Sequence, residues 1–192
     1  MIDGVEALRA EIGGCRLCAD RLPLGPRPIV QIGAGARVRI IGQAPGTKAH
    51  EAGIPWADAS GDRLRDWLGM DSATFYDADA LAIVPMGFCY PGAVKGGGDC
   101  PPRPECAPLW HPRTNAVLGK VRLTLLVGTY AQKRYLPGYQ GMAEAVRAAD
   151  RHLPLFALPH PSWRVVGWMR RNPWFEAETL PRLRAAVAAA LG

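Results

Sequence analysis

The sequence predicts a three-layer α/β/α fold built around a central four-stranded parallel sheet. Four short apolar segments have the length and composition of buried strands, and they lie at Val38 to Ile41, Leu81 to Val84, Leu123 to Val127 and Leu155 to Leu158. Segments with helical spacing precede, separate and follow them. Strands that alternate with helices are typical of a parallel sheet covered on both faces.

The helical segments are justified by their apolar periodicity. Residues 4–13 place Val5, Leu8 and Ile12 on one face, and residues 61–69 do the same with Leu64, Trp67 and Leu68. A third helix is expected around residues 130–135. The last helix has its apolar face at Leu180, Leu183, Val187 and Leu191, and Pro181 fits within its first turn. Cys89 to Pro112 is rich in Gly and Pro and is expected to be a long irregular loop, either functional or held by something other than packing.

Length and composition favour one globular domain over residues 1–192. Hydrophobic residues make up 48% and charged residues 21% of the chain, which excludes disorder and a coiled coil. No apolar run approaches the roughly 18 residues of a membrane span. The first residues are acidic where a signal peptide would be basic. We therefore expect a soluble cytoplasmic protein with no membrane partner, and a monomer by default.

The charge balance favours an anionic partner. Lys and Arg number 23 against 17 Asp and Glu, which gives a net charge of +6. Most of the cations are Arg, whose planar guanidinium suits phosphate. Basic charge alone is a weak signal for nucleic acid.

Two polar motifs follow the first and fourth strands. Gly42-Gln43-Ala44-Pro45-Gly46 permits close approach of a ligand to the backbone, but it is neither a P-loop nor a dinucleotide fingerprint and by itself indicates only a turn. His160 and Ser162 lie in the motif after the fourth strand. A lone His is more often structural, although an imidazole here can stabilise a developing negative oxygen. Because the carboxyl ends of parallel strands meet at one edge, we expect both motifs to converge there.

The ordered set of motifs resembles the uracil-DNA glycosylase superfamily. GQAPG after a strand, GIPWADASGDRLRDWLG, a strand leading to a Cys, LTLLVG and LPHPS occur in that family's order, and the chain is most similar to the iron–sulfur branches, families four and five. The resemblance implies a monofunctional DNA glycosylase of base excision repair. Such an enzyme flips uracil out of single- or double-stranded DNA, hydrolyses its N-glycosidic bond and leaves an abasic site. Two alternatives are a non-catalytic damage-binding module of the same fold and a glycosylase selective for other deaminated bases.

The resemblance also assigns candidate residues. The flipped base would be bound by Gly42, Gln43, Ala44, Pro45, Gly46, Trp56 and Ser162, with Trp56 stacking on it. Asp58 would stabilise the cationic sugar and orient water, and His160 would donate to uracil O2. Two structural alternatives stay open: Trp56 fills the core, and Asp58 or Ser60 caps the following helix while Asp62 lies on the surface.

The same likeness places DNA contacts after His160. Trp163, Arg164 and Val165 would form the wedge that fills the gap left by the base, although they also suit a packed turn. Arg170 and Arg171 would contact phosphates. The match fails at Ala44, where family one has a catalytic Asp, and at Pro85, where family four has an Asn that reads uracil. Base selectivity must then come from backbone groups or from another residue.

The cysteines suggest a metal centre. Five Cys in a cytosolic-looking chain do not suit a disulfide framework. Cys15, Cys18, Cys89 and Cys106 are similar to the four Cys that hold a structural [4Fe–4S] cluster in the resembled branches, and Cys100 is left over. Zinc accepts the same four-sulfur geometry, and a site without metal is the third alternative.

Overall fold

The computed structural model describes residues 4–192 and places four parallel strands in one sheet. They are β1 (Val38–Ile41), β2 (Leu81–Ile83), β3 (Leu123–Val127) and β4 (Leu155–Leu158). The strand order is β2-β1-β3-β4, with Val38 paired to both Leu81 and Leu123, and Thr124 paired to Leu155. The predicted fold class is confirmed, and each predicted strand agrees with the observed one to within one residue.

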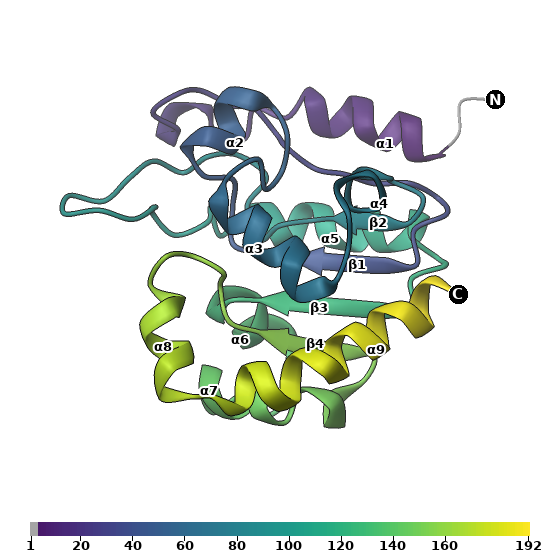
Figure 1. The fold of residues 1–192 in the computed structure, drawn as a ribbon. Coiled ribbons are helices and arrows are strands. Elements are labelled where there is room, and N and C mark those ends of the chain that lie inside the picture. Colours follow the sequence, from purple (N-terminus) through teal and green to yellow (C-terminus); the bar gives the residue numbers. More distant parts are fainter. Residues whose placement is uncertain (1–3) are drawn as a thin grey trace.

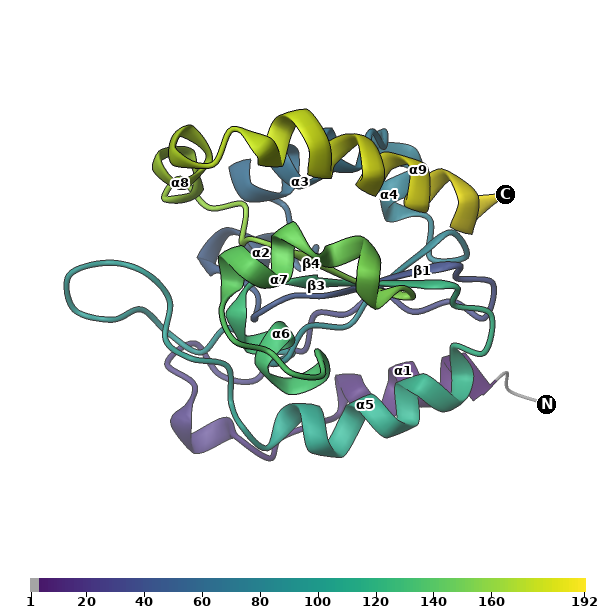
Figure 2. The same cartoon turned by 90° about the horizontal axis from the view of Figure 1, so that it is seen from below.

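Helices cover both faces of this sheet, as Figures 1 and 2 show. The helices of the described part are α1 (Gly4–Gly13), α2 (Thr47–Ala52), α3 (Ala59–Leu68), α4 (Ser72–Tyr76), α5 (Cys106–Val117), α6 (Thr129–Tyr135), α7 (Met142–Arg147), α8 (Val165–Arg171) and α9 (Leu180–Leu191). Short 3₁₀ turns lie at Ala19–Arg21 and Ala149–His152, and a π-helical turn at Phe175–Thr179 leads into α9. None of the described helices is long and apolar enough to cross a membrane.

The core is divided by the sheet into two clusters. On one face, Leu64 and Trp67 of α3 pack with Leu183 of α9 and Phe175, whose ring meets the Trp67 ring edge-on at 4.9 Å. The other face is covered by α1 and α5, which bury the side chains Val5, Leu8, Ile12, Trp110 and Leu118. The helical periodicities at residues 4–13, 61–69 and 180–191 are therefore confirmed as the faces that the helices bury.

The expectation of an irregular segment from Cys89 to Pro112 is wrong for its second part. Residues from Cys106 onward form α5, and Pro112 lies inside that helix. A proline in a helix removes one backbone hydrogen bond, and here α5 is held instead by burial of Ala107, Trp110 and His111 against the sheet. The first part of the segment is a loop that projects beyond the carboxyl ends of the strands (Figure 1). Gly96, Gly97 and Gly98 at its tip all have φ near +100°.

Candidate active site

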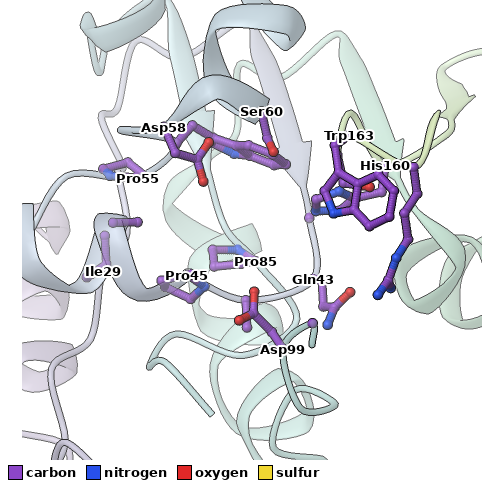
Figure 3. A pocket seen from close by; sticks show the side chains of 18 of the residues that line it. Ile29, Gln43, Pro45, Pro55, Asp58, Ser60, Pro85, Asp99, His160 and Trp163 are labelled. Atoms are coloured by element: carbon purple, nitrogen blue, oxygen red, sulfur yellow. The ribbon is translucent and has the colours of Figure 1, made fainter. Parts of the chain in front are cut away.

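A pocket of about 410 Å³ opens at the carboxyl ends of the strands. Gly42 to Gly46 enter it from the end of β1, Pro85 from the end of β2, and His160 and Ser162 from the end of β4 (Figure 3). Strand order changes direction between β1 and β3, and ligands of open parallel sheets bind at such a point. The predicted convergence of the two motifs is confirmed, and the pocket is lined by every residue of GQAPG.

Trp56 forms a wall of this pocket in a constrained backbone conformation. Its φ is +58°, a region that a bulky residue rarely occupies, and the surrounding structure holds it there. Tyr76 donates its hydroxyl to the Trp56 carbonyl at 3.3 Å, and any Cβ at Gly61 would overlap that same carbonyl. The indole lies close over Gly42, where a side chain would collide with it. Trp56 therefore packs on the core cluster and faces the pocket at the same time.

One carboxylate oxygen of Asp58 forms a hydrogen bond within the protein, and the other faces the pocket. Oδ1 accepts a hydrogen bond from the Gly61 amide at 2.9 Å, so Asp58 is the N-cap of α3. The predicted cap is confirmed for Asp58, and Asp62, paired with Arg65, lies on the surface as expected. Oδ2 of Asp58 lies toward Gly46, the last residue of the β1 loop. The cap thus fixes the side chain while one oxygen is left for the pocket (Figure 3).

His160 lines the pocket next to Trp56. The centroids of the two rings are 5.5 Å apart, and the angle between the ring planes is 36°. Burial lowers the pKa of His160, and the negative charge of Asp58 partly opposes that shift. A lowered pKa favours the neutral imidazole at pH 7, which can donate one N–H to a substrate oxygen. Gly128 at the end of β3 leaves room for this residue, because a Cβ there would lie 3.4 Å from the His160 Cβ.

Arg63 of α3 holds the loop after His160, and sequence reasoning missed it. Its guanidinium donates to the Pro161 carbonyl at 2.7 Å and to the Ser162 carbonyl at 3.2 Å. Since Asp58 caps the same helix, α3 positions both sides of the pocket. No sequence signal marks this contact, because its partners are 98 and 99 residues away along the chain.

Pro85, which lines the pocket at the end of β2, is held in place by a buried histidine. His111 of α5 contacts the Pro85 carbonyl through Nε2 at 2.9 Å and the Tyr135 hydroxyl through Nδ1 at 2.5 Å. Burial lowers the pKa of His111 to about 4, so its ring is neutral. Since a carbonyl only accepts, Nε2 carries the proton, and Nδ1 accepts from Tyr135. Pro85 itself brings no side-chain donor or acceptor.

The backbone carbonyls of Gly42 and Gln43 are engaged inside the protein. They accept hydrogen bonds from the amides of Met86 and Gly87, each at 2.9 Å, which extends the pairing of β1 with β2. The Gln43 side chain donates to the Cys100 carbonyl at 3.3 Å. These carbonyls therefore shape the pocket rather than offering acceptors to a ligand.

Asp99 is a second carboxylate at the rim, and sequence reasoning missed it as well. It follows the glycine tip of the loop, and its backbone forms a bridge with Ala93. Its Oδ2 lies 3.4 Å from the position that a Cβ on Gly46 would take, close to the side from which Asp58 approaches. Partial burial raises the pKa of Asp99, and Asp58 adds to the shift. Figure 3 shows both carboxylates directed into the pocket.

The five predicted DNA-contacting residues fall into three groups. Trp163 is 75% exposed at the pocket mouth, and the Arg164 guanidinium lies 5.3 Å from its ring centroid and 3.4 Å from the Gly97 carbonyl. Val165 is buried in the core cluster at the start of α8, so its placement in an exposed wedge is wrong. Arg170 and Arg171 are exposed in the last turn of α8, outside the pocket lining.

A separate, much smaller cavity of about 30 Å³ gathers four cysteines. Cys15, Cys18, Cys89 and Cys106 line it together with prolines and the rings of Phe88 and Trp110, whereas Cys100 lies elsewhere. Burial raises the pKa of Cys89 to about 11 and that of Cys106 to about 12, and the neighbouring thiols add to both shifts. Among residues 4–192, no group of three or more His, Cys, Asp or Glu is arranged as a metal centre.

This donor set nevertheless fits a thiolate-bound metal. Four sulfurs around one apolar cavity are the ligands that zinc and iron–sulfur clusters share. Because burial raises the pKa of Cys89 and Cys106, both are protonated thiols in the metal-free protein, and a metal would have to displace those protons to bind. Cys106 Sγ also accepts a hydrogen bond from the Phe88 amide at 3.3 Å, a contact that stabilises a sulfur ligand.

The fold and the pocket define a parallel α/β protein with its site at the carboxyl edge of the sheet. The model of the uracil DNA glycosylase superfamily matches residues 30–184. The match covers most of the chain, and the protein belongs to that superfamily. Its function is accordingly of the DNA glycosylase type, with DNA as the substrate. Cys15 and Cys18 precede the matched residues, while Cys89 and Cys106 lie within them.

Proposed function

We propose that this protein is a monofunctional uracil-DNA glycosylase of the iron–sulfur kind. The observation that carries the proposal is the convergence of Trp56, Asp58 and His160 on one pocket at the edge of the sheet. An aromatic wall, a carboxylate and a neutral imidazole are the groups that hydrolysis of a flipped nucleotide requires.

The base enters the pocket and stacks on Trp56. The strained backbone of Trp56, held by Tyr76 and by the absence of a side chain at Gly61, presents the indole as a rigid surface. Rigid walls bind a flipped base without losing further conformational entropy. Gly42 and Gly46 keep the space beside the base free of side chains, and Pro45, Ala44, Gln43 and Ser162 also line it.

Asp58 and His160 act on opposite ends of the breaking bond. As the N-glycosidic bond lengthens, positive charge develops on the sugar and negative charge on the base. The free Oδ2 of Asp58 stabilises the cation and orients the water that attacks it. The N–H of neutral His160 donates to the base oxygen on which the negative charge gathers, and the product is an abasic site.

Trp163 and the nearby arginines bind the DNA around this pocket. Trp163 is exposed beside the mouth and is able to enter the gap that the flipped base leaves, in place of the buried Val165. Arg164 supports the Trp163 ring, and Arg170 and Arg171 contact phosphates. We propose that the protein acts as a monomer in the cytoplasm.

Cys15, Cys18, Cys89 and Cys106 would hold a structural [4Fe–4S] cluster. Bound there, the cluster would supply a cross-link and would take no part in glycosidic hydrolysis. The four cysteines join the loop after α1, the loop after β2 and the start of α5. Iron and sulfide in brown protein would support the cluster. One zinc per chain in colourless protein would show instead that the site binds zinc.

The proposed function is tested by release of uracil from single- and double-stranded oligonucleotides. Wild-type protein is expected to produce abasic sites, and Asp58→Asn is expected to lose most of that activity while Asn keeps the helix cap. Asp62→Asn, on the exposed side of the same helix, is the matched control. Tight binding to uracil-containing DNA without abasic product would contradict the proposal and indicate a damage-binding module.

A further inference from the structure

At the end of β2, the pocket has no side chain that could form hydrogen bonds to a bound base. Pro85 stands at that position, and its carbonyl is already bound by His111. A glycosylase that accepts a flipped base must still recognise its Watson–Crick edge by hydrogen bonds. With Asp58 and His160 assigned to the chemistry, the remaining polar side chains of the lining are those of Gln43, Ser60, Asp99, Ser162 and Arg164.

Asp99 and Gln43 are neighbours at one side of the pocket. The Gln43 amide nitrogen donates one hydrogen to the Cys100 carbonyl, the residue directly after Asp99, and its second hydrogen is left for a ligand. The Asp99 carboxylate has no hydrogen-bond donor or cationic partner among residues 4–192 and lies near the Gly46 backbone. Figure 3 shows both side chains in the lower part of the pocket.

Their geometry is held by backbone contacts. The Cys100 amide donates to the Gly92 carbonyl at 2.8 Å, and the bridge between Ala93 and Asp99 closes the base of the glycine loop. Gln43 is held by the pairing of its own carbonyl with the Gly87 amide. An unpaired carboxylate and an amide with one N–H to spare, both in the pocket lining, offer one acceptor and one donor to a ligand.

This pair matches the edge that deamination creates. Uracil presents a carbonyl at C4 beside the N3–H, and hypoxanthine presents the same arrangement at C6 and N1. Cytosine and adenine present an amino group beside an unprotonated ring nitrogen. With cytosine or adenine in the pocket, the Gln43 N–H would face the amino group, which is also a donor. The Asp99 carboxylate would face the unprotonated ring nitrogen, which is also an acceptor. Such unpaired polar groups strongly disfavour binding.

We infer that Asp99 and Gln43 are the specificity-determining pair, with Asp99 accepting the ring N–H and Gln43 donating to the adjacent carbonyl of a deaminated base. This inference rests on the proposed glycosylase function. It assigns base reading to the loop after β2 and extends the substrate class to bases with an imide-type edge, in purines as well as pyrimidines.

The test compares kcat/KM for wild type, Asp99→Ala, Asp99→Asn and Gln43→Glu on uracil-containing single-stranded DNA. Asp99→Ala is expected to lower kcat/KM by about 10- to 100-fold, the range for one well-placed pair of hydrogen bonds. Asp99→Asn retains an oxygen acceptor and is expected to keep most of the rate. Gln43→Glu turns the donor into an acceptor and is expected to lower the rate as Asp99→Ala does.

A modified substrate separates base reading from a structural effect. In 3-methyluracil a methyl group replaces the N3 hydrogen and both carbonyls are kept, so the wild-type preference for uracil over this analogue should shrink by about 10-fold or more in Asp99→Ala. Asp150→Ala, which removes an exposed carboxylate before the amino end of β4, is the matched control. Wild type without uracil release would overturn the proposed function itself. Active wild type with an unchanged preference in Asp99→Ala would overturn this inference alone.

Discussion

The large pocket and the cysteine cavity lie in the same molecule but are built in opposite ways. The pocket, of about 410 Å³, is lined by loop backbone and by charged side chains whose partners are incomplete. The cavity, of about 30 Å³, is lined by cysteine sulfur, prolines and aromatic rings. A site that must admit and release a ligand keeps unpaired polar groups and open space. In the proposal above, the cavity holds a metal permanently, and all four cysteines would bind it.

One helix connects the two regions. Cys106 at the start of α5 lines the cavity, and His111, five residues later, holds the Pro85 carbonyl at the pocket floor. A change at the cavity is therefore expected to reach Pro85 through α5, whereas the opposite sides of the pocket are held by α3 through Asp58 and Arg63. The following predictions separate the two regions on this basis.

The largest effect is expected from Cys106→Ser. Loss of one of the four proposed ligands should release the proposed metal, because structural metal sites contribute directly to folding. Several kcal/mol of lost stability corresponds to a fall in Tm on the order of 10 °C for a chain of this size. Metal content and thermal unfolding measure this change. Cys100→Ser is the control and should keep both values; equal metal content in the two variants would contradict the four-cysteine site.

The next largest effect is expected on the rate of the reaction rather than on stability. His160→Ala should lower the rate of uracil release by about 100- to 1,000-fold, since one donor to a developing negative charge is removed. Tm should fall less than in Cys106→Ser, because His160 lines the pocket and is only partly buried. Single-turnover kinetics at saturating enzyme measure the rate. A loss of Tm as large as that of Cys106→Ser would mean that His160 is mainly structural.

The third effect is a pH dependence of stability from His111. Its folded pKa of about 4 lies below the ordinary value of 6.5, so the unfolded chain binds the proton first. Stability is complete above pH 6.5 and decreases as the pH falls toward 4, by up to roughly 3 kcal/mol. Denaturant unfolding of wild type and His111→Gln at pH 7 and pH 4 measures this difference. The same pH dependence in both proteins would exclude His111 as its source.

The smallest effect on stability is expected from Trp163→Ala. Because the side chain is 75% exposed, the free energy of unfolding should change by less than about 0.5 kcal/mol. Release of uracil from duplex DNA should fall by roughly tenfold, since the wedge is lost, while release from single strands is nearly unchanged. Paired assays on the two substrates measure the ratio. An equal loss on both would indicate that Trp163 contacts the base or its neighbour instead of filling the gap.

The regularly patterned elements were predictable because their signals are local. Short apolar runs identified all four strands, and helical spacing identified α1, α3 and α9 with the side chains that they bury. The helix expected around residues 130–135 is observed as α6 (Thr129–Tyr135). The other short helices, α2, α4, α7 and α8, were not predicted, because they show no clear apolar period. The first half of α5 was assigned to a loop because Pro112 and the preceding prolines suggest irregular structure, and tertiary burial of Trp110 overrode that preference.

In the candidate site, too, residues with a local sequence signal were predicted and residues without one were missed. His160 could be named because it follows a predicted strand, and Asp58 because its segment resembles a motif of the superfamily. Val165 was misplaced because a motif says nothing of which side chains in a turn face the core. Asp99 and Arg63 carried no signal, since each meets the pocket only through contacts distant in sequence.

By itself, the sequence determined the strands, the parallel sheet and the two loops that carry the chemistry, because alternation of apolar segments and the position of polar residues after them are local properties of the chain. Only the tertiary structure decided which oxygen of Asp58 remains available, that four cysteines share one cavity, and that Asp99 stands beside Gln43. Those relations depend on side-chain orientation and on contacts between distant segments, and both are set by packing of the whole chain.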